Sequence, residues 1–220
     1  MLPMFSRTLR LPALLLALSF APTGEARPTV LPLHSPVALA TTSATAAPQT
    51  TAQVIYDRSD EQEVERLLND TSLRTSLDFA RRLKGRPYVA ATLEVADPER
   101  LVVNLRGLDC ATLVETASAL AMTRREGKRR FADYCRNLER LRYFDGHVAG
   151  YTSRLHYLSF WMADHLRRKT IEEVVLPTNL TQPLHIDLHY MSRHAESYPM
   201  LRNHPERVRE IARLERKYSG

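Results

Sequence analysis

The chain has 220 residues, of which 44% are hydrophobic, so one domain with a buried core is possible. Its formal net charge of +6 suits an anionic partner such as a cell-wall polymer, although a well-solvated basic surface explains the charge equally well. The two cysteines exclude a disulfide-rich scaffold, and there is no CxxC, HExxH or Gly-rich phosphate-binding motif.

Residues 1–26 have the order of a secretory signal peptide. Arg7 and Arg10 precede an apolar run over residues 11–20, and small-residue cleavage patterns end at Ala21 and Ala26. A membrane-spanning helix needs about 20 apolar residues, so we interpret this shorter run as a signal and not as an anchor. No cysteine near the cleavage patterns offers a site for a lipid anchor. We therefore expect an exported protein, periplasmic or extracellular, with no membrane anchor after maturation and no nucleic-acid partner.

Residues 27–52 are rich in Pro, Ala and Thr and contain no acidic residue. Such a segment buries too little apolar surface to offset its conformational entropy. The sequence therefore predicts a disordered linker over residues 27–52 and a domain over residues 53–220.

The domain begins with two expected helices. A capping-box pattern at residues 59–62 predicts a helix to about Leu68. A second helix is expected over residues 72–84, with Gly85 placed to end it. Residues 87–95 are expected to be extended or irregular, and residues 101–103 to form a short strand.

Apolar spacing predicts four later helices, which begin at Cys110, span residues 129–141 and 153–169, and follow Pro205. The helix over residues 153–169 carries an expected core stripe of Leu155, Leu158, Met162 and Leu166.

The expected helix behind Asp109 carries the first candidate for chemistry. Asp109 is a favourable N-cap, and the apolar spacing from Leu113 onward places Cys110 in the first turn, on the face toward the core. A thiol at a helix start is favoured as the nucleophilic thiolate, and free backbone N–H groups there can stabilise an oxyanion. A free cysteine is also among the most buried residue types, so position alone leaves both interpretations open.

Three sequence blocks decide between these interpretations. They are PYVAATLE at residues 87–94, LDCATLVE at residues 108–115 and GYTSRLHY at residues 150–157, with weaker agreement at residues 191–194 and at Tyr198. Together they resemble the NlpC-type, papain-like cell-wall hydrolases. The resemblance is closer to the N-acetylmuramoyl-L-alanine amidase-like branch of that group.

The resemblance implies an α+β, papain-like fold, of which this chain holds mainly the helical front half with few strands. It also implies a secreted amidase or peptidase that cleaves an amide bond of peptidoglycan stem peptides without metal or cofactor. Cys110 matches the nucleophile, and Tyr88 matches a tyrosine beside it.

Further residues in the matching blocks are implied to line the cleft. Ser153, Arg154 and the cap residue Asp109 are assigned to substrate binding, since a guanidinium can form a two-pronged bond to a substrate carboxylate. Arg154 could equally be a solvated residue at a helix end. Tyr157 and Trp161 could stack on the substrate, but core packing is the preferred interpretation for both.

One family feature is missing. The resemblance implies a catalytic His on a β-strand after the cysteine helix, often as His-x-Gly, and no such segment follows Gly150. We therefore expect the domain to be incomplete at its C-terminus, with His156 as the best stand-in for the base. The alternative function is a truncated or degenerate member that binds the cell wall without catalysis, or an unstable fragment.

Two other groups of residues are given structural interpretations. The histidines His185, His189 and His194 are spaced like metal ligands, but their surroundings do not look helical, so no metal site is predicted. Cys135 is expected to be a core residue of its helix.

Overall fold

The computed structural model describes residues 54–174, 176–177 and 184–220. The predicted signal peptide and linker lie outside these residues. The helices are α1 (Arg58–Asn69), α2 (Ser76–Arg82), α3 (Cys110–Arg125), α4 (Phe131–Arg142), α5 (Leu158–Arg167), α6 (Tyr190–Arg193) and α7 (Pro205–Tyr218). The strands are β1 (Val54–Ile55) and β2 (Leu101–Val102), and short 3-10 turns span Phe144–Gly146, Tyr151–Ser153 and Ala195–Ser197.

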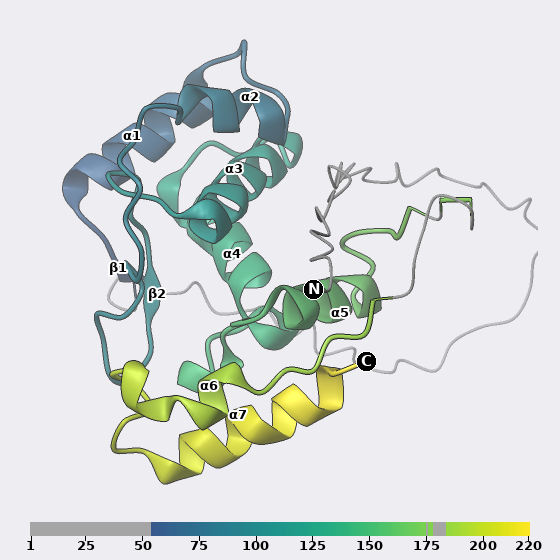
Figure 1. The fold of residues 1–220 in the computed structure, drawn as a ribbon. Coiled ribbons are helices and arrows are strands. Elements are labelled where there is room, and N and C mark those ends of the chain that lie inside the picture. Colours follow the sequence, from purple (N-terminus) through teal and green to yellow (C-terminus); the bar gives the residue numbers. More distant parts are fainter. Residues whose placement is uncertain (1–53, 175, 178–183) are drawn as a thin grey trace, which may run out of the picture.

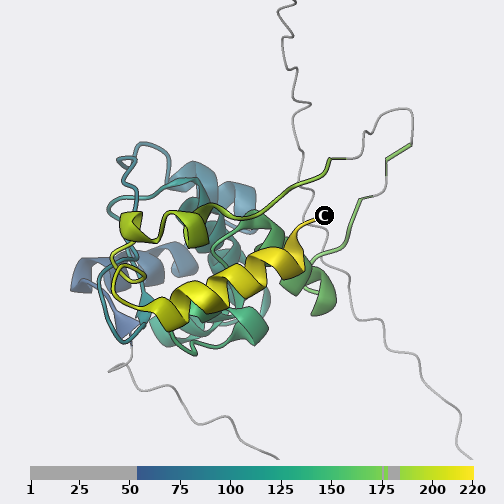
Figure 2. The same cartoon turned by 60° about the horizontal axis from the view of Figure 1, so that its bottom comes forward.

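The helices are arranged in two groups joined by α4. In Figure 1, α1, α2 and α3 lie at one end, and α5, α6 and α7 lie at the other. Figure 2 shows α7 across the face of the second group, with α6 beside it. The two strands form a parallel pair, with Val54 opposite Leu101, at the side of α4. The described residues therefore form a mainly helical unit, and its assignment to the papain-like fold stays a prediction.

Local capping explains where the first helices begin. Asp57 caps α1 and Thr75 caps α2, each in a reciprocal capping box with the acidic residue three positions later. The second helix was predicted from residue 72, which is wrong. Asp70 accepts hydrogen bonds from the backbone and the hydroxyl of Ser72, and this turn delays the helix until after Thr75.

The core forms where α3 packs against α1, α2 and α4. Its fully buried side chains include Leu67, Phe79, Leu120 and Leu138. The guanidinium of Arg142 is buried at the end of α4, where it donates to Glu115 at 2.7 Å and to the carbonyl of Val102 at 2.6 Å. This arginine ties α4 to both α3 and β2.

The helix predicted over residues 153–169 is shorter than expected. A 3-10 turn follows Gly150, whose φ is +89°, and α5 itself begins at Leu158. The predicted core stripe of this helix is wrong at Leu158 and Met162, which are 62% and 37% exposed. Phe160 is buried instead, because it packs against the rings of Phe144 and Tyr218.

The remaining elements agree with the sequence to within a few residues. The strand over residues 101–103, the helix over residues 129–141 and the helix after Pro205 are confirmed. No helix among the residues that the structure describes is long and apolar enough to cross a membrane.

Candidate active site

Cys110 is the first residue of α3, and its position is set by the cap. The side chain of Asp109 accepts a hydrogen bond of 2.8 Å from the backbone of Thr112, whose hydroxyl in turn accepts one of 2.9 Å from the backbone of Asp109. This reciprocal box holds the first turn of the helix, whose leading N–H groups have no partner within the helix. Asp109 therefore serves here as the cap of α3, and its assignment to substrate binding stays a prediction.

The prediction that Cys110 faces the core is wrong. Cys110 is exposed, and so is Val114 one turn later. The buried face of α3 instead carries Thr112, Thr116 and Ala119, because that face packs against α1 and α4. The exposed position makes the thiol accessible to a reactant.

Cys110 opens onto a cavity of about 620 Å³. Three parts of the chain line it: α2, the first half of α3, and the segment from residue 155 to the start of α5. The lining residues are Ser76, Leu77, Ala80, Cys110, Ala111, Leu113, Val114, Glu115, Ala117, Ser118, Leu155, His156, Tyr157, Leu158 and Trp161. Most of these side chains are apolar, which is typical of a ligand site with few polar groups.

Tyr88 lies on the approach to this helix start. It forms a parallel bridge with Leu108, two residues before Cys110, and its ring is mainly exposed. The backbone bonds that fix the bridge are Val89 N–H to Leu108 O at 3.2 Å and Leu108 N–H to Pro87 O at 3.0 Å. Gly107 permits this close approach, since a Cβ there would lie 2.7 Å from the side chain of Val89.

His156 lies on the cavity wall and is partly buried. Its Nε2 is 2.9 Å from the carbonyl oxygen of Tyr151, which can only accept, so Nε2 carries the proton and Nδ1 is the basic nitrogen. Burial lowers the pKa of His156 to about 3, and the positive charge of Arg154 acts in the same direction. A neutral imidazole with so low a pKa is a weak general base.

The geometry argues against the expected substrate role of Arg154. The residue is 6% exposed, and its Nη2 lies 2.7 Å from a carboxylate oxygen of Glu99. Its Nη1 lies 2.5 Å from Glu94, and Glu99 also accepts a bond of 2.8 Å from the hydroxyl of Tyr143. The guanidinium is thus already bonded on both sides, and Arg154 is not among the residues that line the Cys110 cavity. The alternative interpretation, a solvated residue at a helix end, is wrong, because Arg154 is buried.

Ser153 also has a local structural task. Its hydroxyl donates to the carbonyl of Gly150 at 2.7 Å and accepts from the N–H of Ala149 at 2.9 Å. These bonds close the 3-10 turn before Arg154. Of the three residues from this block that were expected to line the cleft, His156 does so, while Ser153 and Arg154 do not.

The two aromatic residues both contribute to the wall. Trp161 is buried and packs on His165 with ring centroids 4.2 Å apart, which confirms the core interpretation for its ring. The hydroxyl of Tyr157 donates to Glu215 at 2.6 Å and thereby ties α5 to α7. No residue of α2 was assigned to the site from the sequence, although Leu77 and Ala80 line the cavity.

Cys135 is buried, as expected, and burial raises the pKa of its thiol to about 12. Both cysteines are free thiols. No group of three His, Cys, Asp or Glu side chains that could hold a metal ion occurs within the described ranges.

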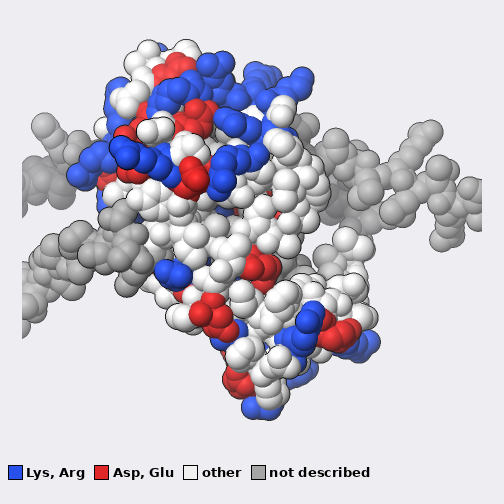
Figure 3. All heavy atoms as spheres, turned by 90° about the vertical axis from the view of Figure 1, so that its left-hand side faces the viewer, with Lys and Arg blue, Asp and Glu red and all other residues white. Residues whose placement is uncertain are grey.

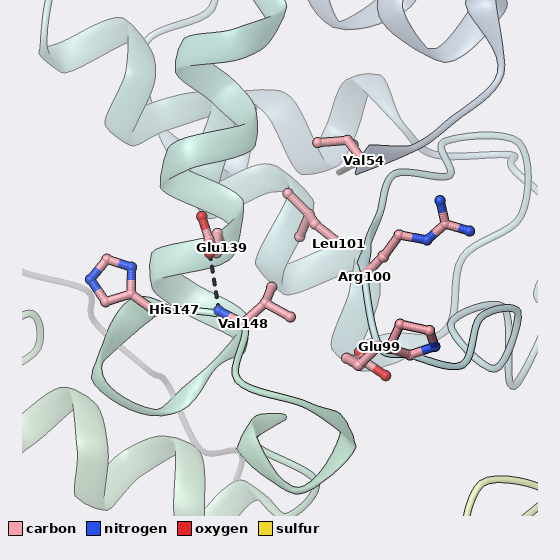
Figure 4. Close-up of a pocket in the computed structure, with 8 residues that line it drawn as sticks. Val54, Glu99, Arg100, Leu101, Glu139, His147 and Val148 are labelled. Atoms are coloured by element: carbon pink, nitrogen blue, oxygen red, sulfur yellow. Dashed lines mark hydrogen bonds between the residues drawn. The ribbon is translucent and has the colours of Figure 1, made fainter. Parts of the chain in front are cut away.

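A second cavity, of about 470 Å³, lies between the strands and the end of α4. Figure 4 shows the hydrogen bond of 3.0 Å from Val148 N–H to Glu139 at its edge, and the side chains of Arg100 and His147 pointing away from each other. With no convergent polar groups and no nucleophile on its wall, this cavity is a weaker candidate than the one at Cys110.

Comparison with known proteins assigns the chain to a family. A family model described as AmiA-like, N-acetylmuramoyl-L-alanine amidase-like, matches residues 78–219. An N-acetylmuramoyl-L-alanine amidase from Bacteroides uniformis ATCC 8492 is 36% identical with a TM-score of 0.59, covering 66% of this chain and 60% of that one. A putative xylanase from Bacteroides fragilis is 43% identical with a TM-score of 0.54, covering 61% of this chain and 58% of that one.

The chain spans about 60% of the length of these solved structures. No curated protein matches it. The family match covers more than half of the chain and includes both the helix that Cys110 opens and the wall that carries His156. The chain therefore belongs to the AmiA-like, N-acetylmuramoyl-L-alanine amidase-like family.

Proposed function

We propose that this chain takes part in peptidoglycan hydrolysis outside the cytoplasm, as a papain-like N-acetylmuramoyl-L-alanine amidase with Cys110 as its nucleophile. The observation that carries the proposal is the exposed thiol of Cys110 at the capped start of α3, open to the cavity. Family membership supports the substrate class, since the Bacteroides uniformis relative is named as such an amidase.

The chemistry follows from this position. The Cys110 thiolate attacks the carbonyl carbon of the muramoyl–alanine amide, and the carbonyl oxygen becomes an oxyanion. Backbone N–H groups at the start of α3 are the proposed donors to that oxyanion. The resemblance to the family adds the hydroxyl of Tyr88, whose backbone is bridged to Leu108. The C–N bond then breaks, the amine leaves with a proton, and water hydrolyses the thioester to release the acid and the thiol.

The proposed reaction also needs a general base that accepts the proton of the thiol. Among the described histidines, His156 is the one on the cavity wall. Because its pKa is about 3, its imidazole is a weak acceptor for the proton of the Cys110 thiol. This observation favours a second candidate function, in which the chain binds stem peptides without cleaving them. The two candidates share the cavity and differ only in turnover.

The experiment is cleavage of a purified muropeptide by the full 220-residue chain, followed by mass spectrometry of the products. We expect cleavage that is lost in Cys110→Ala and kept in the matched control Cys135→Ser. Cleavage that survives in Cys110→Ala would refute the nucleophile.

His156→Ala separates the remaining possibilities. General-base help is typically worth about 10²–10⁴-fold in rate, and the low pKa predicts a loss of less than about tenfold here. A loss of a hundredfold or more, with folding intact, would make His156 the base. Binding without cleavage by the unaltered chain would establish the second candidate function.

A further inference from the structure

A cluster of basic side chains follows the part of α2 that lines the cavity at Cys110. Arg81, Arg82, Lys84 and Arg86 are exposed and occupy the last turn of α2 and the loop that follows it. We call these four residues the basic rim. Figure 3, a view onto the left-hand side of Figure 1, shows that Lys and Arg, with some Asp and Glu among them, also gather on that face of the end that carries α1 and α2.

Helix geometry places the basic rim next to the cavity. Leu77 and Ala80 of α2 line the cavity, and Arg81 lies four residues after Leu77, on the same side of the helix. Lys84 follows in the turn, four residues after Ala80. Arg81 thus continues the cavity side of α2, and the other rim residues lie at the end of that helix and just after it.

Chain connectivity places the basic rim at the same end as the nucleophile. Only three residues separate Lys84 from Tyr88, and Tyr88 is bridged to Leu108, two residues before Cys110. The rim and the nucleophile are therefore connected through the bridge between Tyr88 and Leu108.

The cations of the rim form few close ion pairs. In the part of the chain that the structure describes, no carboxylate forms an ion pair with Arg81, Arg82 or Lys84, while Arg86 pairs with Glu63 at 3.0 Å. Asp78 caps its own helix at Thr75 and attracts Arg81 only at longer range, as Asp70 attracts Arg82.

The cavity presents little negative charge that would oppose an acidic ligand. Glu115 is the acidic residue on its lining, and its carboxylate pairs with the buried guanidinium of Arg142 at 2.7 Å. Among the described residues that line the cavity, no carboxylate is therefore left without a cation.

We propose that the basic rim binds the free carboxylates of an acidic peptide, the stem peptide of the substrate, while the cavity holds the bond to be cleaved. This inference rests on the proposed function and adds to it the residues that would bind the charged groups of the peptide. It moves the carboxylate-binding role from the buried Arg154 to exposed cations on α2.

The test is binding of a synthetic stem peptide that carries free carboxylates, measured by calorimetry with the full chain as Cys110→Ala to prevent turnover. The rim variant combines Arg81→Gln, Arg82→Gln and Lys84→Gln. The control variant removes the same charge from α7 with Arg209→Gln, Arg213→Gln and Arg216→Gln, all exposed. Exposed ion pairs are individually weak, so we expect Kd to rise about tenfold in the rim variant and to stay unchanged in the control.

Two further arms identify the chemistry that is recognised. The same peptide with its carboxylates amidated should bind the unaltered rim about tenfold more weakly, and the rim variant should not distinguish the two peptides. Affinity of the acidic peptide should also fall with added salt for the unaltered rim only.

The outcomes separate this inference from the proposed function. Equal affinity of the rim variant and the unaltered rim overturns the inference, and so does the absence of any binding to the acidic peptide. Tighter rim-dependent binding of a phosphate polymer than of the peptide overturns it too. In each case cleavage that depends on Cys110 would leave the proposed function standing.

Discussion

Arg154 is predicted to hold the fold together. Its guanidinium lies between Glu99, whose side chain is 2% exposed, and Glu94, whose side chain is 17% exposed. It also donates to the carbonyl of Leu93 at 3.1 Å. The substitution Arg154→Ala leaves the buried carboxylate of Glu99 without its cation and that carbonyl without this donor.

The size of the effect follows from the burial. Removing one partner of a buried ion pair costs about 3–5 kcal/mol, because the remaining charge stays in a poorly solvated site. For a domain of this size the melting temperature falls by about 2–4 °C per kcal/mol. We therefore expect Arg154→Ala to lower Tm by roughly 10 °C.

The assay is reversible unfolding by urea and by heat, followed by circular dichroism. The matched control is Arg213→Ala, which breaks an exposed pair with Glu210 whose side chains are 56% and 40% exposed. Such a pair contributes about 0–1 kcal/mol. The double variant Arg154→Leu with Glu99→Leu should recover part of the loss, since it removes both buried charges together.

One result would refute the reasoning. If Arg154→Ala unfolds within about 1 kcal/mol of the unaltered chain and binds the acidic stem peptide more weakly, the guanidinium serves the substrate. The interpretation from the sequence would then be correct and the role assigned from burial wrong.

Three further predictions concern the cysteines, the histidines and the helix cap. Limited alkylation at neutral pH should label Cys110 well before Cys135, because the second thiol is buried with a pKa of about 12; equal labelling in peptide mass spectra would contradict this. Burial lowers the pKa of His156 to about 3 and lowers that of His165 as well, while the unfolded value is about 6.5. The contribution of these histidines to the free energy of unfolding should therefore be complete above pH 6.5 and fall on acidification towards pH 3, by at most about 1.4 kcal/mol per pH unit for each histidine. The prediction would be contradicted if urea titrations showed the same dependence of this free energy on pH in His156→Gln as in the unaltered chain. Asp109→Ala should cost about 1 kcal/mol by loss of the cap, whereas Asp109→Asn should retain most of the stability; an equal loss in both would show that charge matters more than the hydrogen bond.

The sequence by itself determined where several helices begin. Asp109 caps α3 and Pro205 opens α7, as predicted, because capping depends on residues within three or four positions of each other. The short strand at Leu101 and the buried position of Cys135 were also predicted correctly, from apolar residues close together in the chain. Resemblance in three short blocks also identified the family, which the family model confirms.

Only the tertiary structure decided which faces of these helices are buried. The apolar spacing of α3 is compatible with Cys110 facing inward, but the packing of α1 and α4 buries the side that carries Thr112. The partners of Arg154 lie 55 and 60 residues away in the chain, at Glu99 and Glu94. A periodic pattern reports which residues share a face, whereas exposure depends on distant segments that meet only in the folded chain. For this reason Cys110, which was expected to face the core, is exposed, and Arg154, which was expected at the cleft or in solvent, is buried.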